Sequence, residues 1–139
     1  RDAESRLDLD ALPPETAMRR MVETTFDHHA AHPEFVRMVS VENILEARHV
    51  RESPSIRARN AAVIGKLERL LARGVAAGVF RGGVDPLDLH LLISGFCFYR
   101  VSNRHTLGAI YGVEMRAPAR VAAHRAMIAE AGLRFLSPR

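Results

Sequence analysis

The chain has 139 residues, of which 47% are hydrophobic and 6% aromatic, and this is enough for the core of one helical domain. No apolar stretch reaches the ~20 residues needed to cross a bilayer, and a single cysteine excludes a disulfide framework, so we expect a soluble cytoplasmic protein with no membrane partner. The net charge is +4, and residues 100–139 hold seven arginines against two glutamates; because the arginines of the last predicted helix are spread around it with no interleaved aromatic residues, we expect no direct contact with nucleic acid.

The first 13 residues are rich in charge and end at a proline pair, and we interpret them as a lead-in to a domain over 14–139. Apolar residues at helical spacing predict a first helix over 14–31. It breaks before Pro33, because the residue before a proline is pushed out of the helical region. Pro33 then suits the first turn of a second predicted helix, over 33–50.

A third helix is predicted over 54–79, with Ser53 as its N-cap, and two glycines end the segment that follows it. Asp85 is the predicted cap of a fourth helix, which ends at about residue 103. This helix is apolar on almost every side, so it must be buried from several directions. A glycine-containing connector leads to a fifth helix that begins at Pro118. With no strand-like alternation, the chain is predicted to be an all-α, five-helix domain.

The last two predicted helices carry large apolar stripes with small residues beside them, which allows helices to approach closely. Packing within one subunit is one explanation. We favour the other, in which these helices are half of a four-helix bundle between two copies of the chain, because five helices of this size hardly cover both stripes. The expected interface residues of this homodimer are Leu91, Gly95, Phe98, Val121, His124, Ile128 and Phe135.

The sequence holds no assembled active site. His28 and His32 have the i, i+4 spacing of a metal-binding pair, but no further ligand motif accompanies them. Cys97 lies between two phenylalanines, where burial raises the pKa of a thiol and makes it unreactive. We therefore expect no catalytic residue, no metal and no cofactor, and a protein that is not an enzyme.

Glu42 and Asn43 are polar residues in the middle of a broad apolar arc of the second helix. A buried carboxylate needs a partner, and the candidates on neighbouring helices are Arg20, Arg59 and Arg100. Alternatively, both residues orient a small molecule in an apolar pocket. The sequence leaves these two interpretations open.

The order of segments is more specific than any single motif. HPEFVRMVSVENILEARHV at 32–50, LERLLARGVAAGVFRGGVDPLDLHLLISGFCFYRVSN at 67–103 and the following IYG together resemble the ligand-binding and dimerisation domain of TetR-family transcriptional repressors. That family also has an N-terminal helix-turn-helix domain, which nothing in this chain matches. Because the chain does not begin with methionine, we expect it to be a fragment.

The resemblance implies that an effector lies between the first four predicted helices. The candidates carried over by segment are Met18, Val22, Phe26, Met38, Val39, Glu42, Asn43, Ile64, Leu67, Phe96 and Tyr99, and the apolar arcs on which they lie add His29 and Asn103.

We therefore expect the effector-binding and dimerisation domain of a TetR-like repressor, which releases DNA when a small apolar or aromatic ligand binds. Operator DNA would be reached only through the missing N-terminal domain. A helical dimerisation module without a ligand is the second hypothesis, and an enzyme that uses Glu42 and histidines is a distant third.

Overall fold

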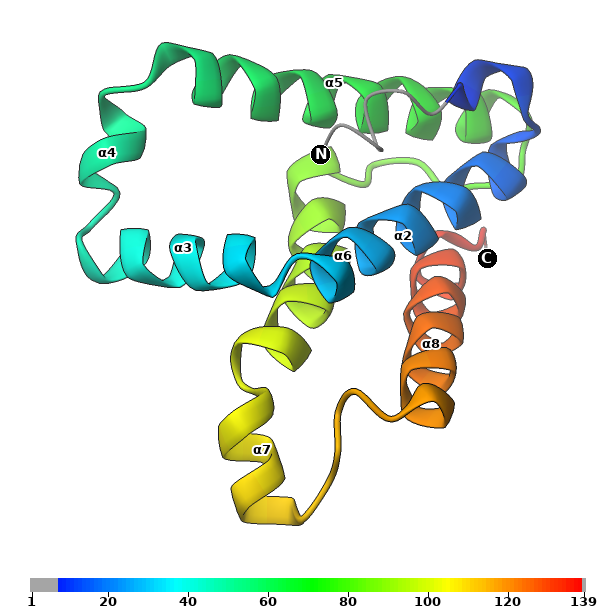
Figure 1. Cartoon of the computed structure of the whole chain (residues 1–139). Coiled ribbons are helices and arrows are strands. Elements are labelled where there is room, and N and C mark those ends of the chain that lie inside the picture. Colours follow the sequence, from blue (N-terminus) through cyan, green and yellow to red (C-terminus); the bar gives the residue numbers. More distant parts are fainter. Residues whose placement is uncertain (1–7, 139) are drawn as a thin grey trace.

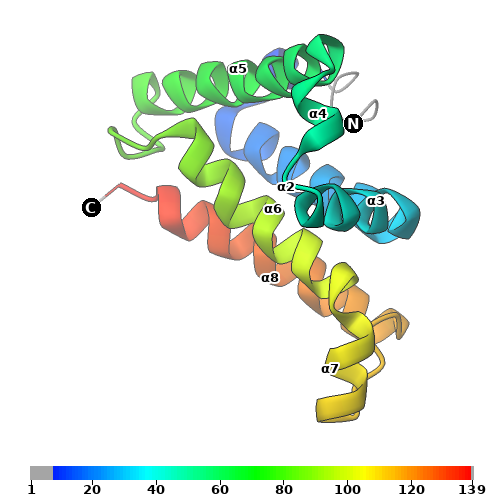
Figure 2. The same cartoon turned by 90° about the vertical axis from the view of Figure 1, so that its left-hand side faces the viewer.

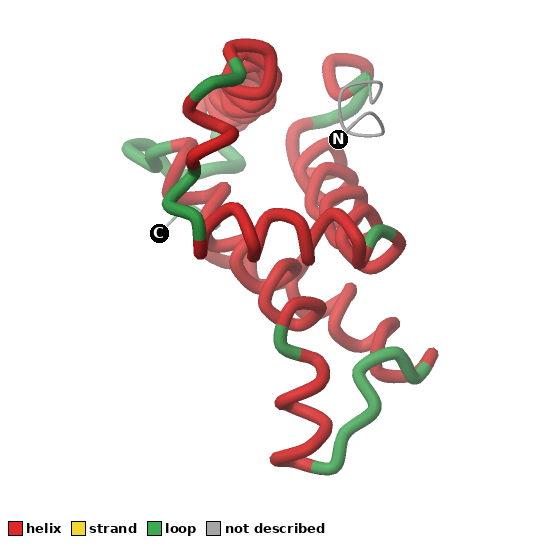
Figure 3. The backbone as a smooth tube through the Cα atoms, turned by 60° about the vertical axis from the view of Figure 1, so that its left-hand side comes forward, coloured by secondary structure: helices red, strands yellow, loops and turns green. Residues whose placement is uncertain are grey.

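The computed structural model describes residues 8–138, and within this range the backbone forms only helices and loops (Figure 3). The prediction of an all-α fold is confirmed. No helix in the described range is long and apolar enough to span a membrane. The elements are the 3-10 helix η1 (Leu9–Ala11) and the helices α2 (Pro14–Ala31), α3 (Pro33–Ile44), α4 (Arg48–Arg51), α5 (Pro54–Ala76), α6 (Pro86–Ser102), α7 (Arg104–Tyr111) and α8 (Pro118–Leu136).

Helix α2 is the centre of the domain, and α5, α6 and α8 all pack against it (Figure 1). Its apolar arc is therefore enclosed, with Met18, Val22 and Phe26 at most 1% exposed. The arc meets Leu70 of α5 and Leu136 of α8 in a single core cluster. A helix covered from several sides needs such a wide apolar face.

Helices α6 and α8 lie side by side and run in opposite directions, while α7 extends beyond the end of α6 (Figure 2). The start of α6 is capped as predicted, because the Asp85 carboxylate accepts hydrogen bonds from the backbone N–H groups of Leu87 at 2.7 Å and Asp88 at 3.4 Å. The hydroxyl of Ser53 caps α5 in the same way, by accepting from the Ile56 N–H at 3.4 Å. Local cap chemistry thus sets where both helices begin.

Two predicted helix ends were wrong, and so was the prediction of a connector without a helix between the last two helices. The second helix ends at Ile44, not at residue 50, since Glu46 and Ala47 adopt left-handed φ angles of 57° and 63°; the short helix α4 follows. The third ends at Ala76, not at 79, and Gly78 with φ 75° takes the chain out of it. The predicted connector contains α7, which ends where Gly112 turns left-handed at φ 67°. Glycine adopts this conformation without steric cost.

The predicted lead-in partly belongs to the folded body. Its residues 1–7 lie outside the described residues. Leu9 is only 6% exposed and is part of the core cluster. The Arg73 guanidinium of α5 donates hydrogen bonds to the carbonyl oxygens of Leu9, at 2.9 Å, and of Leu12. The structured domain therefore begins at least as early as Leu9.

Candidate functional site

A pocket of about 280 Å³ lies between the C-terminal end of α2, helix α3 and the face of α6 that α3 covers. We call it the histidine pocket. Three histidines and two phenylalanines contribute to its wall, together with aliphatic and small polar side chains. Its lining residues are His28, His29, Phe35, Val39, Asn43, His90, Leu91, Ser94, Gly95 and Phe98.

Aromatic rings from three helices form part of the wall of the histidine pocket. The helical path breaks at His32, between α2 and α3. Phe35, in the first turn of α3, lies against the last turn of α2. The ring centroid of Phe35 lies 5.2 Å from that of His28 and 6.1 Å from that of His29, and Phe98 of α6 lies 6.2 Å from His29, all in edge-to-face arrangements. Such pairs add to the hydrophobic contribution of the rings and join the three helices around the pocket.

The polar groups of the histidine pocket are few and oriented. His29 is 7% exposed, and its Nδ1 lies 2.8 Å from the Thr25 carbonyl oxygen. Because a carbonyl only accepts, this nitrogen carries the proton. Asn43 donates from its amide to the Val39 carbonyl at 2.9 Å, and Ser94 lies 3.3 Å from Nδ1 of His90. A pocket of this kind can orient a mainly apolar molecule by a few hydrogen bonds.

Three of the predicted ligand contacts, His29, Val39 and Asn43, line this pocket. Four others belong to the closed core, because α2 and α5 turn these side chains toward each other and toward α6 and α8. Their exposed fractions are 2% or less, and none lines the pocket: Met18, Val22, Phe26 and Leu67. Met38, by contrast, is 66% exposed on the outer side of α3, and Ile64 is half-buried on α5.

Glu42 has a structural partner that the sequence did not reveal. Its carboxylate accepts hydrogen bonds from the backbone N–H groups of His49 at 2.6 Å and Val50 at 2.9 Å, and it lies 2.9 Å from Nδ1 of His49. These bonds, led by that of Val50, hold the pKa of Glu42 below its ordinary value. The carboxylate closes the turn between α3 and α4. A carboxylate stabilised in its charged form is a weak base, which argues against Glu42 as a catalytic base.

The stripe of α6 that lines the histidine pocket is not the one that the sequence assigned to a ligand pocket. Leu91, Gly95 and Phe98, predicted for a dimer interface, line the histidine pocket. Of the predicted pocket residues, Phe96 packs edge-to-face on His124 of α8 at 5.6 Å between centroids. Tyr99 is 56% exposed. The third of these predicted pocket residues, Asn103, ends α6 and does not line the pocket either.

Within the subunit, the predicted interface stripe of α8 is covered to different degrees. Ile128 is 4% exposed and lies in the core cluster, with Val121 packed against that cluster. His124 accepts a hydrogen bond from Nε of Arg100 at 3.1 Å. Phe135 is 39% exposed, and the guanidinium carbon of Arg81 lies over its ring, 4.4 Å from the ring centroid. The most exposed large apolar residue of α8 is Met127, at 49%.

The His28 and His32 rings are close, with centroids 4.7 Å apart. His32 uses its Nδ1 for a 2.9 Å hydrogen bond to the His28 carbonyl, so that nitrogen donates and is unable to bind a cation. Across residues 8–138 no group of three or more His, Cys, Asp or Glu side chains is placed to hold a metal ion.

Sequence reasoning missed several residues that line the histidine pocket. The available signal was on α6, where His90 and Ser94 interrupt an otherwise apolar run at i, i+4 spacing. Polar residues on one face of a buried helix mark a side that is not simply core. Phe35 gave no comparable signal, because the direction of its side chain depends on the angle that the chain takes at His32, between α2 and α3.

Residues 14–131 match the family model described as the tetracyclin repressor-like C-terminal domain. The chain is also similar to the HTH-type transcriptional repressor NicS of Pseudomonas putida. The two are 35% identical over 113 residues, which cover 81% of this chain and 53% of that relative. The chain thus spans about half the length of the curated relative that it matches.

Proposed function

The chain belongs to the TetR family of transcriptional regulators, as a C-terminal domain, and from this we propose that it is the effector-binding and dimerisation part of a repressor. The relative that it resembles is named as an HTH-type transcriptional repressor. In the intact protein, a helix-turn-helix domain would contact the operator, and this domain would control the spacing of two such units. Half-site spacing on DNA makes that separation decisive for binding.

The histidine pocket is the proposed effector site, and its position between α2, α3 and α6 is the observation that carries the proposal. Its volume of about 280 Å³ suits a small molecule. Aromatic walls with a few hydrogen-bonding groups favour an apolar or aromatic ligand, for which Asn43, His90 and Ser94 are the orienting side chains.

The proposed mechanism is a shift between two arrangements of the helices. An effector in the histidine pocket contacts α6 directly and reaches α2 and α3 at the same time. If it binds one arrangement of these helices more tightly, it stabilises that arrangement by the difference in affinity. Because α6 also carries exposed apolar residues on another side, a change in its position would be transmitted to a partner subunit.

The proposed partner is a second copy of the chain, packed on α6 and α8. Leu92 is 42% exposed, Tyr99 56% and Met127 49%, although large apolar side chains are normally covered when they are grouped. Leu92 and Tyr99 are seven residues apart on α6, which places them on one side of the helix. This side lies next to Phe96, whose ring reaches His124 of α8.

We predict that Leu92→Arg converts the homodimer into a monomer of 15.4 kDa. The new charge would be buried in the proposed interface without a partner, which destabilises association strongly. Size-exclusion chromatography with light scattering measures the mass. Leu87→Arg is the matched control, since Leu87 is 50% exposed at the start of the same helix but on another side, and it should stay dimeric. Equal masses for both variants would refute this interface.

We predict that Val39→Trp blocks effector binding. Val39 is a half-buried lining residue of the histidine pocket, so a larger side chain there occupies the space of a ligand. Native mass spectrometry of the parent protein would identify a retained small molecule. The affinity for that molecule should fall at least about tenfold in Val39→Trp.

Val41→Trp is the control for this experiment, because Val41 lies on the same helix but is 51% exposed and outside the pocket. Its affinity should stay within about twofold of the parent. In the intact regulator, Val39→Trp should remain bound to its operator when the effector is added. A parent protein that retains nothing and responds to no compound in a thermal-shift library would favour a dimerisation module without a ligand.

A further inference from the structure

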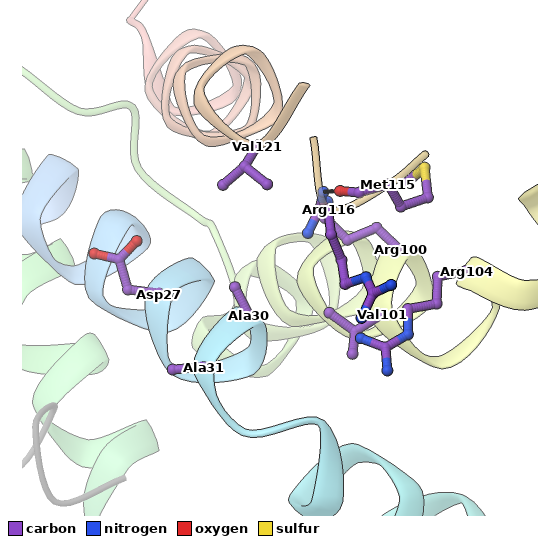
Figure 4. Close-up of a pocket in the computed structure, with 9 residues that line it drawn as sticks. All are labelled: Asp27, Ala30, Ala31, Arg100, Val101, Arg104, Met115, Arg116 and Val121. Carbon is purple, nitrogen blue, oxygen red and sulfur yellow. Dashed lines mark hydrogen bonds between the residues drawn. The ribbon is translucent and has the colours of Figure 1, made fainter. Parts of the chain in front are cut away.

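A second pocket, of about 420 Å³, lies on the other side of α2 from α3 and α5, where α6, α7 and α8 meet the end of α2 (Figure 4). We call it the arginine pocket. It shares no lining residue with the histidine pocket. Three arginines gather along one side of it, and Asp27 lies at the opposite end (Figure 4). Its lining residues are Asp27, Ala30, Ala31, Arg100, Val101, Arg104, Met115, Arg116 and Val121.

Arg100 is a buried cation with neutral partners. It is 5% exposed, and it donates from one Nη to the Met115 carbonyl at 2.7 Å and from Nε to His124 at 3.1 Å. Its guanidinium carbon also lies 4.9 Å from the centroid of the Phe26 ring. The two hydrogen bonds use two of the five N–H donors of a guanidinium. None of these partners carries a negative charge that offsets the burial of the cation.

Two acidic groups lie near this pocket, Glu114 and Asp27, and neither forms an ion pair with Arg100. Among the described residues, no carboxylate oxygen lies within 4.0 Å of a nitrogen of Arg100 or Arg104. Arg116 has one exposed partner, Glu114, at 3.5 Å. The hydrogen bond from the Arg116 backbone N–H holds the pKa of the Glu114 carboxylate below its ordinary value, and the charge of Arg104 also helps to do so. Both carboxylate oxygens of Asp27 already accept hydrogen bonds from the Arg125 guanidinium, at 2.8 and 2.9 Å. Arg125 does not line the pocket.

A buried charge without an opposite charge is costly, and the cost falls when a counter-ion binds. A carboxylate is well matched to a guanidinium, since two oxygens can accept two parallel N–H bonds. The remaining wall is apolar, because Ala30, Ala31, Val101, Met115 and Val121 line it. The pocket therefore combines a cationic side with a hydrophobic floor.

We propose that the arginine pocket binds a small organic acid, whose carboxylate contacts Arg100, Arg104 and Arg116 and whose apolar body lies against the alanine and valine side chains. This is a second ligand site in addition to the proposed effector site. The ligand would join α6 and α7 to the segment that carries Met115 and Arg116. An inorganic anion would satisfy the arginines but would leave the apolar wall in contact with water.

The test uses benzoate as the probe, benzamide as its neutral counterpart, and isothermal titration at pH 7 and constant ionic strength. Benzoate should bind to the parent protein, and benzamide should bind at least about tenfold more weakly, because it lacks the charge. The double variant Arg104→Gln/Arg116→Gln should lower the benzoate affinity at least about tenfold. Arg100 is kept in this variant, since its side chain also packs on Phe26.

Arg120→Gln is the matched control. Arg120 is an exposed residue of α8 that does not line the pocket. Its substitution removes one nearby positive charge, and the benzoate affinity should stay within about twofold of that of the parent protein. Val39→Trp should also leave it unchanged, and this separates the arginine pocket from the histidine pocket. Three results would each overturn the proposal. The first is equal binding of benzoate and benzamide, and the second is an equal loss of benzoate affinity in the double variant and in Arg120→Gln. The third is binding of inorganic phosphate as tight as that of benzoate.

Discussion

Replacing Phe26 with alanine is expected to lower the free energy of unfolding by about 3–5 kcal/mol. The side chain is 1% exposed at the centre of the core, so its removal leaves a cavity that α5, α6 and α8 can close only in part. The Arg100 guanidinium also loses the ring over which it lies, at 4.9 Å. Urea denaturation followed by circular dichroism measures the change.

Tyr111→Ala is the control for Phe26→Ala. It removes an aromatic ring of similar size from the end of α7, where the side chain is 70% exposed. Its effect should stay within about 0.5 kcal/mol. If Phe26→Ala were equally mild, Phe26 would not be a core residue, and its sequence-based assignment to a ligand pocket would regain support.

Replacing Gly74 with alanine is expected to destabilise the domain by about 1–3 kcal/mol, or more. A Cβ atom at this position would lie 1.8 Å from Cδ2 of Phe80, a ring that is 4% exposed. The ring has little freedom to move aside, because the N–H of Phe80 donates to the Gly74 carbonyl at 3.1 Å. Thermal unfolding by differential scanning calorimetry measures the loss.

Gly65→Ala is the matched control on the same helix, α5. The nearest atom to a Cβ at Gly65 is the flexible end of Arg69, at 3.6 Å. Here the only expected effect is the higher helix propensity of alanine, which stabilises by up to about 1 kcal/mol. The two substitutions should thus change stability in opposite directions. A gain in both variants would show that the end of α5 and Phe80 pack less tightly than described.

Both core predictions bear on function, because the same helices form the core and the pockets. One side of α6 packs into the core through Leu89, Ile93 and Cys97. Another side lines the histidine pocket through Leu91, Gly95 and Phe98. A third side remains exposed. Because the core, the pocket and the exposed apolar side each need apolar residues, α6 is apolar on almost every side, as its sequence shows.

Several features could be predicted from the sequence because they depend on neighbouring residues. Pro33, Ser53, Asp85 and Pro118 mark helix starts, since proline at the first turn and a capping side chain act within a few residues. The all-α class follows from helical spacing of apolar residues. The order of segments likewise sufficed for the resemblance to the TetR family. The ends of helices were less predictable. The second helix ends at residues with left-handed φ angles, Glu46 and Ala47, and neither is a glycine that would have marked the end in the sequence.

The sequence by itself determined the class of fold, most helix starts and the family. Only the tertiary structure decided which apolar residues are core and which line a pocket, because helical periodicity identifies a stripe but not the neighbour that covers it. Phe26 and Phe98 were both plausible ligand or interface residues, yet one is enclosed by three helices and the other lines the histidine pocket. Glu42 found its partner seven residues away in a turn, and Arg100 reached Met115 across a connector. Such pairings arise when the chain folds back on itself, and a local pattern does not encode them.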